Sequence, residues 1–108
     1  MINQIYSSDL KQKLDQKEKI LLIDCREQNE WDAGHIQEAV LMPLGQFEEL
    51  FKTLDKNAQI IVQCRSGQRS MRACVFLEEK GFENLTNLEG GIIGWAQSGY
   101  PIVESDGE

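Results

Sequence analysis

The chain has 108 residues, of which 41% are hydrophobic and 27% charged, values typical of a single soluble globular domain. Its formal net charge of −7 argues against nucleic acid or an anionic membrane as a partner. No apolar run approaches the roughly 20 residues that span a bilayer, and the first residues hold no apolar core of a secretory signal, so we expect a cytoplasmic protein.

The first half of the chain predicts strands separated by short helices. Residues 4–7 are a weak strand candidate, and "SSDLKQKLDQ" (7–16) predicts a helix that opens on serines able to cap it. The aliphatic run "ILLIDC" (20–25) is typical of a buried strand in a parallel sheet. "AVLMPL" (39–44) predicts a third strand, and Pro43 near its end favours a sheet edge.

The second half repeats this alternation. "QFEELFKTL" (46–54) predicts a helix with one apolar face, and "QIIVQC" (59–64) predicts a second buried strand. The segment 67–82 predicts a long, largely buried helix, with Gly81 as the C′ residue just after the helix end. A weaker strand and a short helix follow, at residues 84–89 and 90–99. Strands that alternate with helices predict an α/β domain with right-handed crossovers.

The three cysteines, Cys25, Cys64 and Cys74, do not form a recognisable disulfide or metal pattern. Their number is odd and their spacing wide, so a disulfide framework is not expected. The chain has no Cys-x-x-Cys pair, and its one histidine, His35, is not spaced from a cysteine as a zinc ligand would be. We therefore expect neither a metal nor a cofactor.

One cysteine begins the segment "CRSGQRS" (64–70), which is basic in an otherwise acidic chain. From Cys64 to Leu77 there are three arginines and no acidic residue, which indicates a site for a small anion. The segment follows a predicted strand and precedes a helix, where ligands of α/β sheets bind.

This position should activate the Cys64 thiol. A helix N-terminus and neighbouring arginines lower a thiol pKa from about 8.5. Gly67 allows the loop to curl, so that backbone N–H groups point at an anion. The segment contains no histidine, so activation would be electrostatic. The alternative, that the cysteine merely fills the core, suits Cys74 beside Val75 better than Cys64.

Three segments resemble the single-domain rhodanese-like sulfurtransferases. "CRSGQRS" resembles the active-site loop of that family. "LLIDCREQNEWDAGHIQEAVLMPL" is similar to its Asp-x-Arg, Glu-x-x-x-Gly-His-Ile and Ala-Val pattern, and "LEGGIIGWAQSGYP" resembles its closing Gly-Gly-x-x-x-Trp segment. The resemblance covers about residues 3–103, so we expect one rhodanese-like domain over 1–103 and a short acidic tail over 104–108.

The resemblance implies a fold and a reaction. The fold is a small five-stranded, mostly parallel sheet flanked by helices on both faces. The reaction moves a sulfane sulfur from an anionic donor such as thiosulfate to a thiol or cyanide acceptor, through a persulfide on Cys64. A thioredoxin-like protein is one candidate acceptor. The implied substrate-binding residues are Arg65, Ser66, Gly67, Gln68, Arg69 and Ser70, with the two arginines orienting the donor and a serine hydroxyl as an added donor.

Residues outside this loop receive supporting roles. We expect Asp24 and Arg26 to brace the loop by an ion pair, and the resemblance makes His35 structural. Cys25 ends the strand that lies beside the one ending at Cys64 in the family's sheet order. It is either a core residue or a resolving thiol that releases the sulfur.

Two rival functions stay open. Phosphatases and arsenate reductases of the cell-cycle phosphatase type bind a tetrahedral dianion in a Cys-x5-Arg loop, whereas here Arg69 lies five residues after Cys64 and the sixth is Ser70. The other rival is a non-catalytic rhodanese-like interaction module, although such modules typically lack the cysteine.

Overall fold

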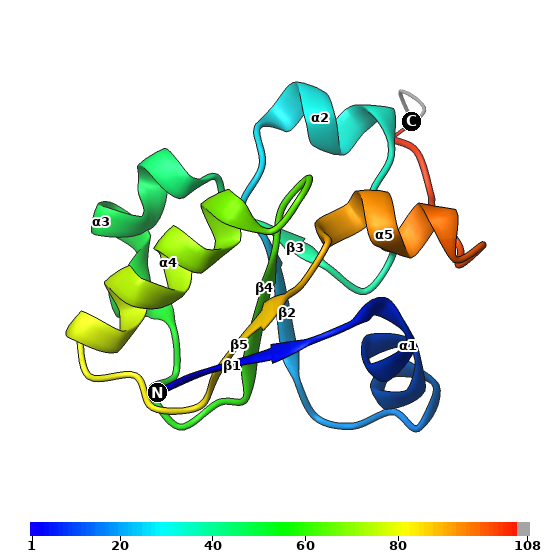
Figure 1. The fold of residues 1–108 in the computed structure, drawn as a ribbon. Helices are drawn as coiled ribbons and strands as arrows, with labels where there is room; N and C mark the ends of the chain where they lie inside the picture. Colours follow the sequence, from blue (N-terminus) through cyan, green and yellow to red (C-terminus); the bar gives the residue numbers. More distant parts are fainter. Residues whose placement is uncertain (106–108) are drawn as a thin grey trace.

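The computed structural model describes residues 1–105, and the remaining residues of the predicted acidic tail, 106–108, lie outside the described part. Its centre is a five-stranded sheet in the order β1-β5-β4-β2-β3, in which every strand pair is parallel (Figure 1). The strands are β1 (Ile2–Ile5), β2 (Leu21–Asp24), β3 (Val40–Leu41), β4 (Ile60–Gln63) and β5 (Leu85–Leu88). This confirms the predicted fold class.

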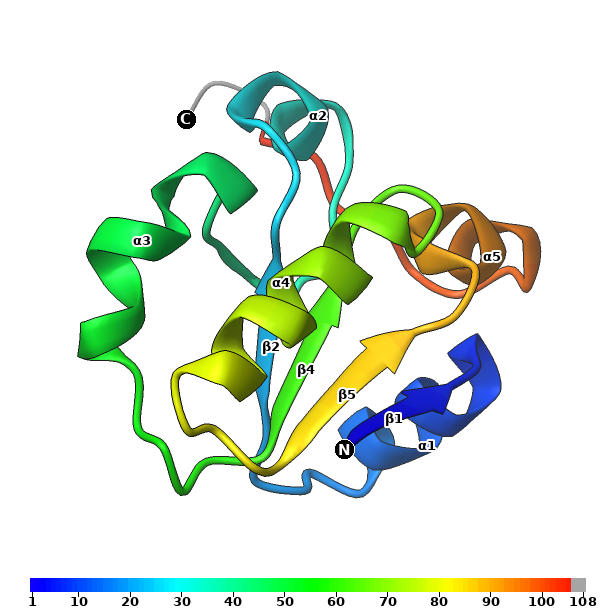
Figure 2. The ribbon, with the colours of Figure 1, turned by 60° about the vertical axis from the view of Figure 1, so that its left-hand side comes forward.

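Helices cover both faces of the sheet. They are α1 (Ser7–Asp15), α2 (Gln28–Ala33), α3 (Phe47–Leu50) with the 3-10 turns Leu44–Gln46 and Phe51–Thr53 at its ends, α4 (Gln68–Glu79) and α5 (Gly91–Gln97). Figures 1 and 2 show α3 and α4 on one side of the sheet and α1 and α5 on the other. Among residues 1–105, none of these helices combines the length and apolar character that a membrane span requires.

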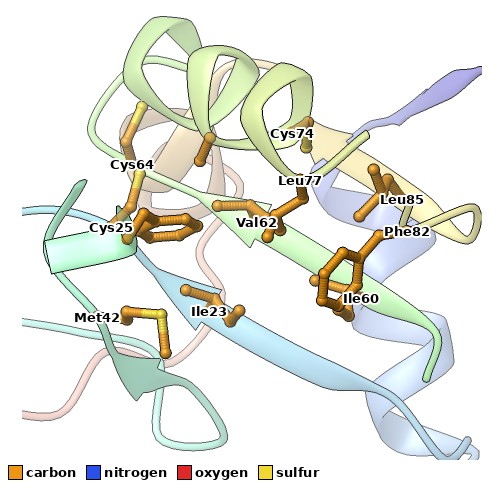
Figure 3. Packing of buried hydrophobic residues seen from close by; sticks show 12 residues of the cluster. Ile23, Cys25, Met42, Ile60, Val62, Cys64, Cys74, Leu77, Phe82 and Leu85 are labelled. Carbon is orange, nitrogen blue, oxygen red and sulfur yellow. The ribbon is translucent and has the colours of Figure 1, made fainter. Parts of the chain in front are cut away.

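Each face has its own apolar cluster, because alternate strand residues point to opposite sides. Ile60 and Val62 of β4 pack with Leu77 of α4 on one face, where Figure 3 shows the cluster closely. Ile61 of β4 packs with Trp95 of α5 on the other. Cys64 follows β4 and belongs to the first cluster. The central strand β4, which Cys64 directly follows, is therefore packed against apolar side chains on both faces of the sheet.

Several element boundaries differ from the prediction. The strand β3 within the segment 39–44 is only Val40–Leu41, but hydrogen bonds continue beyond it on either side of Pro43: the Met42 N–H donates to Asp24 O at 2.9 Å and the Leu44 N–H donates to Cys25 O at 3.1 Å. Its place at the sheet edge is as predicted. Helix α1 begins after Tyr6, whose N–H is accepted by the Asp9 carboxylate at 3.0 Å, so the predicted serine cap is wrong.

The predicted helix 46–54 is divided into 3-10 and α segments. Within it, Phe47 is buried in the first apolar cluster. The long helix is close to the prediction. It ends at Glu79, and beyond it Gly81 N donates to Glu78 O and Phe82 N to Leu77 O, both at 3.1 Å. These are the two bonds of a Schellman motif, as expected for Gly81 after a helix end.

Candidate active site

The Cys64 sulfur lies at the carboxyl end of β4, in the loop that leads into α4. It accepts the Gly67 N–H at 3.1 Å and the Ser70 N–H at 3.4 Å, and the Ser70 hydroxyl oxygen lies 3.4 Å away. Gly67 has φ +105°, a left-handed conformation that a residue with a side chain rarely adopts. The curled loop therefore aims its N–H groups at the sulfur, as in an anion-binding nest.

These contacts favour the thiolate. A hydrogen bond from the Cys25 thiol is the largest influence, and the Ser70 hydroxyl and the N–H groups of Ser70 and Gly67 add to it. Burial opposes ionisation, since Cys64 is only 1% exposed, but together the donors lower the pKa of Cys64 to about 4. The sulfur is consequently ionised at neutral pH.

The other two cysteines have different surroundings. Cys25 lies next to Cys64, as Figure 3 shows, and its pKa is raised because its thiol donates to the Cys64 sulfur, because it is buried, and because the neighbouring thiolate repels a second charge. Cys74 donates to Thr86 O at 3.7 Å, and burial raises its pKa to about 12. Cys74 is thus a buried core residue, as predicted.

Asn87 of β5 holds the loop from beneath. Its side-chain oxygen accepts the Ser70 hydroxyl, and its amide nitrogen donates to Gly67 O at 3.2 Å and to the Gln4 side chain at 3.3 Å. One side chain therefore ties both residues that donate to the Cys64 sulfur. Asn87 is not among the predicted site residues, although a polar residue in a strand covered on both faces needs such partners.

The start of α5 supports the loop from the side. Ile92 N donates to Cys64 O at 2.9 Å, and Ile93 N donates to Arg65 O at 3.1 Å. Gly91 packs against this backbone so closely that a Cβ there would lie 2.5 Å from Cys64 O, and its φ is +57°. The carbonyl groups of Cys64 and Arg65 thus accept hydrogen bonds from the backbone of α5.

The polar side chains of the loop divide into two groups. Arg65, Ser66 and Gln68 are exposed to solvent, whereas Ser70 is fully buried. Of the two candidate serines, Ser70 is the one that contacts the sulfur.

Arg69 is paired with an acidic residue, although the segment from Cys64 to Leu77 contains none. Its guanidinium forms two hydrogen bonds to the Glu30 carboxylate of α2, at 2.8 and 2.9 Å. The pair lowers the pKa of Glu30 to about 2 and raises that of Arg69. The acid comes from 39 residues earlier in the chain, so the local sequence gives no sign of it.

The predicted ion pair between Asp24 and Arg26 is present and buried. Arg26 Nη2 lies 2.8 Å from Asp24 Oδ2 and also donates to Gly34 O at 2.7 Å. The pair therefore fixes Gly34, the residue that follows α2, and it is linked to the loop through Glu30 of that helix, which accepts hydrogen bonds from Arg69. His35 is structural, since its ring stacks on Trp31 at a centroid distance of 3.6 Å.

No three His, Cys, Asp or Glu side chains converge as metal ligands would within the described residues. What the site offers is a single buried thiolate in a cradle of N–H donors, a second thiol against it, and arginines at its rim. Such a site suits a covalent adduct on sulfur more than acid–base chemistry.

Comparison with known proteins identifies the family of the chain. Residues 7–98 match the family model for the rhodanese-like domain. A protein named sulfurtransferase from Allochromatium vinosum is 38% identical over 99% of this chain and 100% of its own. A putative sulfurtransferase of Bacillus subtilis, YtwF, is 42% identical over 87% of this chain and 90% of its own.

A solved structure has the same fold. The crystal structure of a rhodanese-related protein from Thermoplasma volcanium superposes with a TM-score of 0.84 at 32% sequence identity. The alignment covers 94% of this chain and 97% of that one. Related domains also occur inside larger proteins, since a tRNA uridine(34) hydroxylase of Buchnera aphidicola is 33% identical over 81% of this chain but only 30% of its own length.

Proposed function

The chain belongs to the rhodanese-like family, and from that premise we propose that it is a sulfurtransferase that carries a sulfane sulfur as a persulfide on Cys64. The observation that carries the proposal is the Cys64 sulfur held as a thiolate by the N–H groups of Gly67 and Ser70. The same donors suit the charged outer sulfur of a persulfide, because a nest of N–H groups binds an anion without a matched side chain.

The proposed reaction has two steps. The Cys64 thiolate attacks the outer sulfur of thiosulfate, and sulfite leaves with the electron pair of the broken S–S bond. A thiol or cyanide then attacks the outer sulfur of the persulfide, and Cys64 leaves as a thiolate. The low pKa of Cys64 assists the second step in particular, since a thiol of lower pKa leaves faster.

Arg65 is the arginine best placed to meet the donor. It is exposed and forms no salt bridge among the described residues, whereas Arg69 is held by Glu30. A guanidinium binds the oxygens of thiosulfate in a fork. The donor therefore meets Arg65 directly and meets Arg69 only in competition with the Glu30 carboxylate.

Phosphate-ester hydrolysis is the less favoured activity. The loop has one residue fewer than a Cys-x5-Arg loop, and its arginine bonds to Glu30 on α2. We expect negligible hydrolysis of p-nitrophenyl phosphate.

The other alternative is a non-catalytic interaction module. It predicts that Cys64 does not react with iodoacetamide at neutral pH.

The test of the proposal is single-turnover loading. Mixing the protein with thiosulfate should release sulfite in an amount equal to the protein and add a sulfur atom that cyanide removes as thiocyanate. Cys64→Ala should do neither, and Cys74→Ala is the matched control for a buried cysteine. Loading on Cys74, or phosphatase turnover without any persulfide, would contradict the proposal.

A further inference from the structure

The second thiol at the site has no part in the reaction described so far. We propose that Cys25 is an internal acceptor, which attacks the loaded Cys64, forms a Cys25–Cys64 disulfide and releases the carried sulfur as sulfide. The inference rests on the proposed persulfide, and it gives the protein a further activity, sulfide release without an external acceptor.

The sheet register brings the two cysteines together. Asp24 of β2 pairs with Gln63 of β4, and Cys25 and Cys64 are the next residue of each strand. The pairing continues past the strand ends, since Cys25 N donates to Gln63 O at 3.0 Å. Neighbouring strands lie about 4.7–4.9 Å apart, which is inside the range of about 4.4–6.8 Å between the Cα atoms of a disulfide.

The side chains also point to the same side. Ile23 and Cys25 along β2, and Val62 and Cys64 along β4, all belong to the one apolar cluster drawn in Figure 3. Figure 3 shows the two cysteine side chains next to each other at the carboxyl ends of their strands. A disulfide between them therefore requires only local rotation of the two side chains.

Burial favours the internal thiol over an external one. Cys25 is 0% and Cys64 1% exposed, so an external thiol must enter a closed site, whereas Cys25 already packs in the same buried cluster as Cys64. Cys74 does not compete, because its thiol donates to Thr86 O. An acceptor held in contact gains from proximity over one that must diffuse in.

The step balances without an added oxidant. The Cys25 sulfur attacks Cys64 Sγ, the bond between Sγ and the outer sulfur breaks, and the outer sulfur leaves with that electron pair. It takes the proton of the Cys25 thiol and departs as hydrosulfide. The two cysteine sulfurs together lose two electrons and the sulfane sulfur gains them. An external dithiol or thiol then reduces the disulfide and restores the site.

Formation of the persulfide on Cys64 makes the Cys25 thiol easier to deprotonate. Before loading, the thiol donates to a charged sulfur; after loading, the negative charge is on the outer sulfur and Sγ is neutral. The proton then has a new acceptor in the group that leaves. Cys25 is thus a donor in the empty site and a nucleophile in the loaded one.

The experiment follows the loaded protein after excess thiosulfate has been removed and in the absence of thiols. Wild type should release sulfide in an amount equal to the protein while its mass falls by the added sulfur and two hydrogens. Peptide mapping should find Cys25 joined to Cys64. Because the step is within one chain, its rate should not depend on protein concentration.

Substitutions separate the two roles of Cys25. Cys25→Ser keeps a hydroxyl that donates to Cys64, so it should load sulfur and hold it until an external thiol is added. Cys25→Ala lacks both functions and should also raise the pH midpoint of Cys64 alkylation. Cys74→Ser should release sulfide as wild type does.

A persulfide that lasts as long in wild type as in Cys25→Ser, with no crosslinked peptide, would overturn the inference, and so would a release rate that rises with protein concentration. These outcomes leave the proposed function standing. That function fails separately, if no variant releases sulfite or forms a persulfide. The crosslink in wild type is decisive even if Cys25→Ser does not fold.

Discussion

Replacing Ser70 by alanine should weaken the thiolate of Cys64 in a measurable way. The Ser70 hydroxyl lies 3.4 Å from the sulfur, and a hydrogen bond to a charged group is worth about 1.5–3 kcal/mol. One pKa unit corresponds to about 1.36 kcal/mol, so the pKa of Cys64 should rise by about one to two units. We expect the lower end, because the hydroxyl has a single proton and also donates it to the Asn87 side-chain oxygen.

The assay is the rate of iodoacetamide alkylation of Cys64 against pH, read by mass spectrometry. The reactive form is present above the pKa and lost as the pH falls through it, so the wild-type rate should decline around pH 4, following the lowered pKa. Ser70→Ala should move this midpoint to about pH 5 to 6, by the same hydrogen-bond energy.

Ser66→Ala is the matched control, since Ser66 belongs to the same loop but is exposed. It should leave the midpoint where it is. An equal shift in both variants, or no shift in Ser70→Ala, would refute the role given to the hydroxyl. A wild-type midpoint at or above about 8.5, the value of a free thiol, would refute the activation of Cys64 altogether.

Three further outcomes are expected. Glu30→Gln should lower the KM for thiosulfate by about 1.4- to 5-fold, the range of an exposed ion pair of about 0.2–1 kcal/mol, because Arg69 is released; an increase in KM would contradict this. Arg65→Ala should weaken thiosulfate use by roughly 1.5–3 kcal/mol, the value of a charge-assisted contact, seen as a lower kcat/KM with an unchanged alkylation rate. Gly91→Ala should lower the free energy of unfolding by about 1–3 kcal/mol through overpacking and slow Cys64 alkylation, whereas Gly45→Ala, with open space around it, should do neither.

The sequence predicted some parts of the site. These are the parts that lie within a few residues of one another or at the ends of neighbouring strands. The aliphatic runs predict a parallel sheet, and ligands of such sheets bind at the carboxyl ends of the strands, where Cys64 lies. The position of Cys25 beside it was implied by the sheet order of the family that the sequence resembles. The curl at Gly67 follows from the short loop between a strand and a helix.

The contacts between distant segments were not predictable in this way. Glu30 reaches Arg69 because α2 lies over the start of α4, and Asn87 reaches Ser70 because β5 is the neighbour of β4. Neither arrangement has a local signal. Asn87 did carry a general one, since an amide inside a doubly covered strand must find partners.

The order of the strands has a consequence for how the chain folds. β1 (Ile2–Ile5) pairs with β5 (Leu85–Leu88), so β1 is made before the other strands of this sheet but has no partner until β5 has been made. Until then the central strand β4 can join only β2, and its other edge stays open with unpaired N–H and C=O groups. Parallel pairs over such separations form slowly. The domain is therefore most exposed to aggregation before β5 has been made, at the edge of β4 that later receives β5 and, with it, the asparagine that holds the active loop.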